Sequence, residues 1–151
     1  MKQKKVDTKN KTKALNKAHV TSSGGVIRTE RGWAGHFICG HRCLFRRNTL
    51  LAYGETKVVV STVGLMLMND RENDPKKRFD TIGHNRHFET MAFHAGNDKY
   101  QDAEVSRQVN FESDWAIAEL DGELKANEMH EAVVAELTDK LLKGDKLESS
   151  Y

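Results

Sequence analysis

The chain has 151 residues, of which 38% are hydrophobic and 30% are charged, and its formal net charge is +2. This length suits one domain that is large enough to bury a core without disulfide bonds. Two cysteines, Cys39 and Cys43, are too few for a disulfide framework and favour a reducing compartment, which makes the cytoplasm the expected location. No apolar run approaches the roughly 20 residues that a membrane-spanning helix needs, so no membrane partner is expected.

Charge is distributed unevenly along the chain. Residues 1–50 carry 12 basic and 2 acidic side chains, residues 51–100 carry 7 of each, and residues 101–151 carry 5 basic and 13 acidic ones. Such asymmetry indicates an electrostatic partner for one end. The alternative is a solubilising basic tail and a solvated acidic helix face.

The chain is predicted to begin with a basic disordered tail over residues 1–22, because seven lysines occur there without hydrophobic periodicity. The sequence SSGG at residues 22–25 indicates a turn or hinge at its end. One domain is expected over residues 23–144, followed by a short C-terminal tail over residues 145–151.

The domain is predicted to contain an antiparallel sheet of about five strands. The segment 43–53 could carry a bulge at residues 46–48, and Gly54 with Glu55 marks a hairpin turn. The segment 56–68 is β-branched and almost uncharged, which predicts a central strand covered on both faces. Strand patterns cover residues 33–39, 43–53, 56–68, 79–82, 86–95 and 102–111.

The C-terminal part is predicted to be helical. Ser113 is a plausible N-cap for a short helix over residues 115–120. A longer amphipathic helix is expected over residues 123–143, ended by Gly144 and covering one face of the sheet. Its apolar stripe consists of Ala126, Met129, His130, Val133, Val134, Leu137 and Leu141. The fold class predicted from these elements is α+β.

Zinc is one candidate ligand, because Cys39 and Cys43 with His84 and His87 could supply four N/S ligands. The spacing is not that of a usual zinc knuckle, and an ordinary buried cysteine or turn explains these residues as well. No cofactor is therefore expected, with zinc as the alternative.

Acid–base catalysis is a second candidate, with His84 or His87 as the base and Glu89 as the orienting carboxylate. The alternative is a solvated strand edge in which Glu89 pairs with Arg86. His130 begins HEAVV and lacks the second histidine of the metalloprotease motif, so it is interpreted as a satisfied histidine at the core edge. The balance favours a protein that is not an enzyme.

Nucleic-acid binding is a third candidate, because basic side chains suited to phosphate recur in the N-terminal half. The alternative is solvated charge on turns. The candidate contact residues for nucleic acid or another partner are Arg42, Arg46, Arg47, Lys76, Lys77, Arg78 and Arg86.

Five motifs together resemble small accessory proteins carried by phages and mobile elements. They are RGWAGHFIC at residues 31–39, RRNTL at 46–50, VVVSTVG at 58–64, HFETMAF at 87–93 and NEMHEAVVAE at 127–136. The resemblance covers about residues 25–140 and assigns no functional residue. It implies a bacterial host cell and a host or phage protein or ribonucleoprotein as partner, with anti-CRISPR inhibitors of host defence as one such class.

The preferred hypothesis is therefore a non-enzymatic binding protein, which could present the acidic residues 112–148 to a nucleic-acid-binding groove. Two alternatives stay open. One is a small metal-assisted hydrolase or nuclease that uses the Cys/His-rich strand ends, and the other is a nucleic-acid-binding accessory protein.

The basic tail leads to the first prediction. A truncated chain that begins near Ser22 is expected to melt like the full chain, because residues 1–18 lack apolar anchors. If the lysines contact phosphates, nucleic-acid affinity falls and the slope of log affinity against log salt becomes shallower by roughly 0.7–0.9 per lost contact. Thermal unfolding and a salt titration measure both effects. A large drop in Tm, or an unchanged salt slope, contradicts the prediction.

Overall fold

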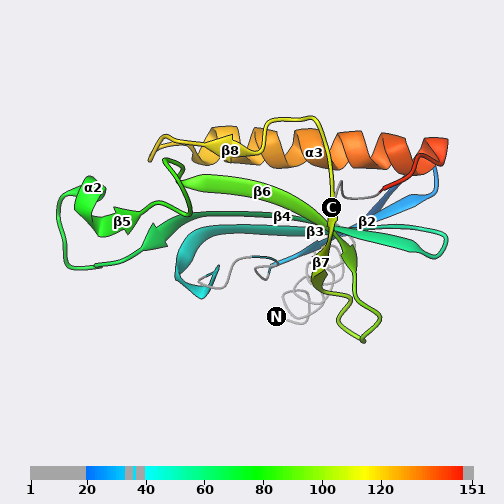
Figure 1. Cartoon of the computed structure of the whole chain (residues 1–151), viewed down its shortest axis with the longest axis horizontal. Helices are drawn as coiled ribbons and strands as arrows, with labels where there is room; N and C mark the ends of the chain where they lie inside the picture. The colour runs from blue at the N-terminus through cyan, green and yellow to red at the C-terminus, as the bar shows by residue number, and fades with distance from the viewer. Residues whose placement is uncertain (1–19, 33–35, 37–39, 148–151) are drawn as a thin grey trace, which may run out of the picture.

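The computed structural model describes residues 20–32, 36 and 40–147. One antiparallel sheet is crossed on one face by a long C-terminal helix (Figure 1). This arrangement confirms the α+β class and the covering helix, but the described residues form a sheet of eight strands rather than about five. No helix in these described ranges is long and apolar enough to cross a membrane.

The main path of the sheet has the strand order β1-β2-β3-β4-β6-β7, while β5 pairs with β4 and β8 pairs with β6. The strands are β1 (Val20–Ser23), β2 (Val26–Arg31), β3 (Cys43–Tyr53), β4 (Thr56–Leu67), β5 (Phe79–Asp80), β6 (Phe88–Ala95), β7 (Ala103–Val109) and β8 (Ala116–Ile117). The helical segments are η1 (Gly40–Arg42), α2 (Pro75–Arg78) and α3 (Glu123–Lys143).

The β3–β4 hairpin lies at the centre of the sheet, as the sequence predicts. Its register runs without a shift from Cys43 opposite Met66 to Tyr53 opposite Thr56, so the predicted bulge at residues 46–48 is absent. Every residue of β4 from 58 to 66 is buried. The prediction of a central strand covered on both faces is confirmed.

Both ends of the predicted domain extend further than expected. Gly24 and Gly25, with φ of 60° and 96°, form the turn of a β1–β2 hairpin, so Val20 to Ser22 lie in a paired strand. The rest of the predicted tail lies outside the described residues. A truncated chain that keeps this hairpin should therefore begin at or before Val20 instead of near Ser22. At the C-terminus Leu147 is buried in the core, while residues 148–151 lie outside the described part.

One local prediction is wrong, one loop contains a helix that the sequence did not predict, and one predicted strand is not tested. The short helix over residues 115–120 is wrong: this stretch contains β8, and Ser113 donates from its backbone N and its Oγ to Glu136 instead of capping a helix. The charged loop after β4 contains α2, which Asp74 caps by accepting from the backbone N of Lys76. The strand predicted over residues 33–39 lies outside the described residues, apart from His36.

Helix α3 has the predicted bounds and the predicted buried stripe. Its stripe residues Val133, Val134 and Leu137 pack in one core cluster with Leu51 and Val60 of the sheet. Gly144 ends the helix in the left-handed conformation, with φ of 72°, as C-terminal glycines commonly do.

Within this interface His130 is fully buried and both ring nitrogens are hydrogen-bonded, Nε2 to Thr49 Oγ1 and Nδ1 to Thr62 Oγ1, each at 2.7 Å. Thr49 donates to the carboxylate of Glu30 at 2.7 Å, so its oxygen accepts from His130 Nε2–H. Nδ1 of the neutral ring then accepts from Thr62, which in turn accepts from Thr90 at 2.6 Å. The result is one directional chain from Thr90 to Glu30 through the helix–sheet interface.

This chain requires a neutral imidazole. Burial, followed by the positive charge of Arg47, lowers the pKa of His130 from 6.5 to about 3. Glu30 is ionised at neutral pH: burial acts to raise its pKa, but hydrogen bonds from Thr49 and Arg28 outweigh burial and hold the pKa below its usual value.

The depressed pKa of His130 makes stability dependent on pH. A histidine whose pKa is lower in the folded chain contributes stability that is complete above pH 6.5 and is lost as pH falls toward 3. The free energy of unfolding should fall by up to about 1.4 kcal/mol per pH unit in this window. His130→Gln should be less stable than wild type at neutral pH by about 1–3 kcal/mol and should lack this slope. Urea unfolding at several pH values between 7 and 4.5 measures both effects, and equal slopes for the two proteins contradict the prediction.

Candidate functional site

The residues of the zinc hypothesis are not assembled in the part of the chain that the structure describes. Cys43 is buried with Val63, Met66 and Ile82, His84 is exposed, and Cys39 lies outside the described residues. No group of three or more His, Cys, Asp or Glu side chains within residues 20–32, 36 and 40–147 is arranged to hold a metal ion. Zinc binding by this set stays a prediction.

Glu89 of β6 is the best-connected of the predicted catalytic residues. Its side chain is buried, and its Oε2 accepts from Arg86 Nε at 2.6 Å. Its Oε1 lies 3.0 Å from Nε2 of His36. His84 is exposed, and His87 Nδ1 donates to the carbonyl oxygen of Ala118, so neither of them is the hydrogen-bonded partner of Glu89.

His36 also contacts Ser61 of β4, with 2.8 Å between Nδ1 and Oγ. Ser61, His36 and Glu89 are thus connected in the order of a Ser–His–acid triad. Nucleophilic catalysis additionally needs a hydroxyl that substrate can reach, with donors for the developing oxyanion. Ser61 is 0% exposed in the middle of the central strand, so its hydroxyl does not meet the first of these requirements in this structure.

The charge of Glu89 is retained in the folded chain. Burial alone acts to raise the pKa of this carboxyl, but hydrogen bonds from His36 and Arg86, together with the positive charge of Arg86, outweigh burial and hold the pKa below its usual range. The sequence motif that contains Arg86 and Glu89 revealed this pair. No local pattern indicated that His36 joins this pair, because its two partners lie 25 and 53 residues further along the chain.

Arg86 connects this buried cluster to an exposed aromatic ring. Its guanidinium carbon lies 4.7 Å from the centroid of the Trp115 ring, a cation–π distance. On the other side Arg86 packs against Gly83, where an added Cβ would come within 2.5 Å of its Nη2. The backbone N of Thr90 donates to the carbonyl oxygen of Trp115 at 2.7 Å. Trp115, although 49% exposed, is therefore held at both its ring and its backbone.

A cavity of about 350 Å³ lies beside this ring, where β6 and β7 diverge. The two strands pair at Ala92 opposite Val109, whereas the earlier part of β6 pairs with β8. The Arg86–Glu89 pair forms part of the lining. The rest combines aromatic and apolar groups with amides and a hydroxyl: Thr90, Met91, Gln108, Val109, Asn110, Phe111 and Trp115. A partner side chain could enter here without displacing any strand.

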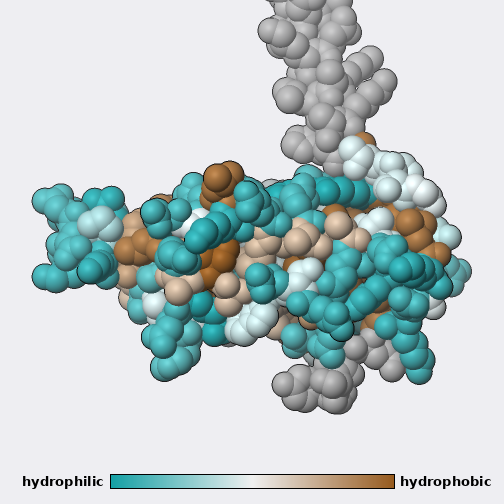
Figure 2. Space-filling view, turned by 90° about the horizontal axis from the view of Figure 1, so that it is seen from above, coloured by the Kyte–Doolittle hydropathy of each residue, from teal (hydrophilic) through white to brown (hydrophobic). Residues whose placement is uncertain are grey.

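The segment around Trp115 is strongly acidic. Residues 112–131 carry seven acidic side chains and one lysine. Lys125 pairs with Glu119 at 3.1 Å, and Arg28 pairs with Glu131 at 2.7 Å. The other five carboxylates are exposed and form no ion pair with the described residues: Glu112, Asp114, Asp121, Glu123 and Glu128. Figure 2 looks onto the side that α3 crosses, where the surface is mostly hydrophilic and hydrophobic residues appear at separate places.

The seven basic residues predicted to contact phosphate or a partner divide into two groups. Arg47, Arg78 and Arg86 are partly buried and bound within the chain, to Glu30, to the carbonyl oxygen of Glu72 and to Glu89. The other four are exposed: Arg42, Arg46, Lys76 and Lys77.

No known protein family, curated protein or solved structure matches the chain.

The buried pair leads to a prediction about stability. Glu89→Gln should lower the free energy of unfolding by about 1.5–3 kcal/mol, because it leaves the partly buried Arg86 without its carboxylate. Glu104→Gln is the matched control: its pair with Arg107 spans 3.4 Å, and both side chains are nearly half-exposed. The control should change stability by less than about 0.5 kcal/mol. Urea unfolding at pH 7 measures both variants, and equal losses would show that the cluster contributes nothing beyond an ordinary surface pair.

Proposed function

We propose that the chain is a non-enzymatic binding protein that docks residues 112–131 against a basic surface of a protein or ribonucleoprotein. The observation that carries this proposal is Trp115, a half-exposed aromatic side chain that is fixed by Arg86 within a segment rich in unpaired carboxylates. We call the surface of residues 112–131 the acidic face.

The tryptophan supports the proposal through binding energetics. A few residues, most often Trp, Tyr and Arg, supply most of the free energy of a protein interface. A side chain that is already immobile loses little conformational entropy when a partner covers it. Trp115 is such an aromatic residue, its ring is restrained by the contact with Arg86, and the adjoining cavity gives a partner side chain a place to insert.

The carboxylates support the choice of partner. Exposed charges contribute modestly to affinity, but they steer association toward surfaces of opposite sign and exclude partners of like charge. Two of the five unpaired carboxylates, Asp121 and Glu123, also suit the positive end of the helix dipole of α3. Glu112, Asp114 and Glu128 have no such role and favour a cationic partner.

A ribonucleoprotein of a host defence system fits this description, because its protein part must present cationic grooves to nucleic acid. Carboxylates of the acidic face would then occupy places that phosphates take in such a groove. The resemblance to accessory proteins of phages and mobile elements favours an inhibitor of a CRISPR-type complex as the specific case.

Nucleic-acid binding is the second candidate function, favoured by the four exposed cations Arg42, Arg46, Lys76 and Lys77. These residues belong to η1, β3 and α2, so a nucleic acid would use a surface other than the acidic face.

Capture from bacterial lysate at about 0.15 M salt tests the proposal with matched variants. Trp115→Ala should reduce the retained partner at least tenfold, which is about 1.4 kcal/mol of binding free energy. A triple variant, E112Q with D114N and E128Q, should reduce it similarly at this salt, and its deficit relative to wild type should shrink as salt rises, because salt screens the charges that the variant lacks. The controls are Val105→Ala, an exposed apolar residue of β7, and Asp139→Asn, whose carboxylate pairs with Lys143 on the same helix.

Both controls should retain the partner, and all variants should keep the wild-type circular dichroism spectrum. The proposal fails if no protein or ribonucleoprotein is retained at this salt. It also fails if the acidic-face variants retain as much partner as the controls. A partner that is lost only when Lys76 and Lys77 are replaced by Gln would assign binding to the nucleic-acid candidate instead.

A further inference from the structure

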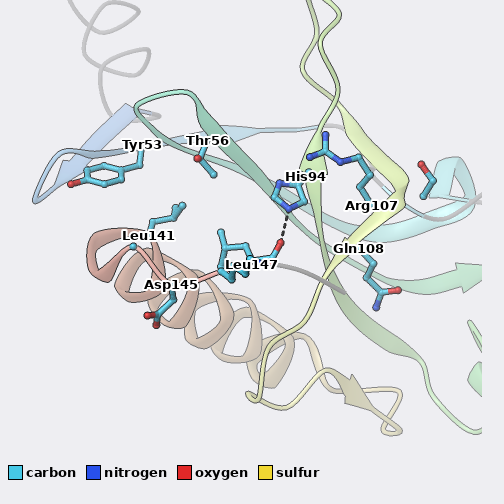
Figure 3. A pocket seen from close by; sticks show the side chains of 11 residues that line it. Tyr53, Thr56, His94, Arg107, Gln108, Leu141, Asp145 and Leu147 are labelled. Atoms are coloured by element: carbon cyan, nitrogen blue, oxygen red, sulfur yellow. Dashed lines mark hydrogen bonds between the residues drawn. The ribbon is translucent and has the colours of Figure 1, made fainter. Parts of the chain in front are cut away.

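A larger cavity, of about 630 Å³, lies between the β3–β4 hairpin, β7 and the segment that follows α3 (Figure 3). It opens at the start of β4, where Thr56 lines it. The carbonyl oxygen of Trp115 accepts from the backbone N of Thr90. Thr90 lies opposite Thr62 of β4, six residues after Thr56. Thr56 and Thr62 lie roughly 20 Å apart along β4, at about 3.3 Å per residue. Gln108 of β7 lines both this cavity and the one beside Trp115, but no residue of the acidic face lines this cavity.

The wall formed by the C-terminal segment is held in place by specific contacts. After Gly144 the backbone N of Asp145 donates to the carbonyl oxygen of Lys140 at 3.0 Å, which closes the helix end. Leu147 is buried in the main core, and its carbonyl oxygen accepts from His94 Nε2 at 2.6 Å (Figure 3). The cavity is therefore formed in the folded chain before any ligand enters.

The wall formed by β7 departs from regular strand geometry. The register between β6 and β7 shifts between Phe93 and Ala95. Three consecutive residues of this irregular stretch, Ser106, Arg107 and Gln108, line the cavity. Bulges of this kind redirect side chains and are common beside binding sites.

Basic side chains and hydrogen-bond donors lie around Arg107. This residue, with Thr56 and His94, lines both this cavity and an adjoining one of about 380 Å³. Lys146 lines the first cavity and Lys57 lines the second. With Arg107, the two cavities therefore have three basic side chains and two carboxylates, Asp145 and Glu55. The 3.4 Å pair between Arg107 and Glu104 is solvent-exposed and competes only weakly with a bound anion.

The opposite side of the cavity offers an apolar platform. The Tyr53 ring is 38% exposed and packs against Gly25, where an added Cβ would lie 3.4 Å from its Cε1. Leu141 lies next to this ring in Figure 3, while Arg107 lies across the cavity. A ligand with a planar group at one end and an anion at the other would match both sides.

We infer that this cavity binds a phosphate ester of nucleotide size, with its phosphate on Arg107 and its planar base against Tyr53. The volume lies within the range of about 300–1,000 Å³ that small-ligand sites occupy. Arginine suits phosphate because its planar fork can donate two parallel hydrogen bonds. A free nucleotide and the 5′-phosphorylated end of a nucleic-acid strand share this chemistry.

Calorimetric titration of the full chain with AMP, adenosine and a 5′-phosphorylated dinucleotide tests the inference. AMP should bind at least tenfold more tightly than adenosine, with a Kd of about 1 mM or below, which corresponds to a binding free energy of about −4 kcal/mol. Tighter binding of the dinucleotide than of AMP assigns the strand end as the ligand, and weaker binding assigns the free nucleotide. Both results support a phosphate-ester site.

Arg107→Gln should weaken AMP binding at least tenfold while Tm stays unchanged. Arg71→Gln, an exposed arginine in the loop after β4, is the matched control and should bind AMP like wild type. Absence of AMP binding at 5 mM overturns the inference. Equal affinity for AMP and adenosine also overturns it, as does an Arg107→Gln variant that binds AMP normally. None of these results depends on whether the acidic face retains a partner.

Discussion

The hydrogen-bond chain through His130 is the constraint on which the arrangement of the molecule depends. Apolar packing alone would let α3 slide or rotate on the sheet at modest cost, because hydrophobic contacts have no direction. His130 permits one position, in which Nε2 donates to Thr49 and Nδ1 accepts from Thr62 at 2.7 Å each. A displaced helix would leave several buried polar groups without partners, at about 1–3 kcal/mol each.

Both candidate sites depend on the position of α3. Glu136 of α3 accepts the backbone N–H groups of Glu112 and Ser113, which fixes the start of the segment that carries Trp115. The C-terminal end of the same helix supplies Leu141 and the turn at Gly144, which form a wall of the larger cavity.

Local signals in the sequence predicted most of the fold. The β-branched run of β4, the hairpin turn at Gly54 and the 3.6-residue stripe of α3 each act over short distances and appear in the structure as predicted. The β1–β2 pair was missed because its strands are short and largely polar. β8 was taken for a helix because Ser113 resembles an N-cap, whereas its partner is Glu136, 23 residues away. Distance along the sequence also decided which site residues were predicted. Arg86 and Glu89 are close in sequence and were identified, whereas His36 and Trp115 join them only through tertiary contacts.

The tautomer and charge of His130 test the central interaction most directly. Nitrogen-15 NMR of the histidine side chains distinguishes the Nε2–H tautomer, the Nδ1–H tautomer and the imidazolium by their ring chemical shifts. The structure predicts that His130 is neutral and protonated on Nε2 at pH 7 and keeps that form as pH falls to about 5, because its pKa is lowered to about 3. An Nδ1–H tautomer at pH 7, or an imidazolium that forms above pH 6, would contradict the directional chain and the placement of α3 that rests on it.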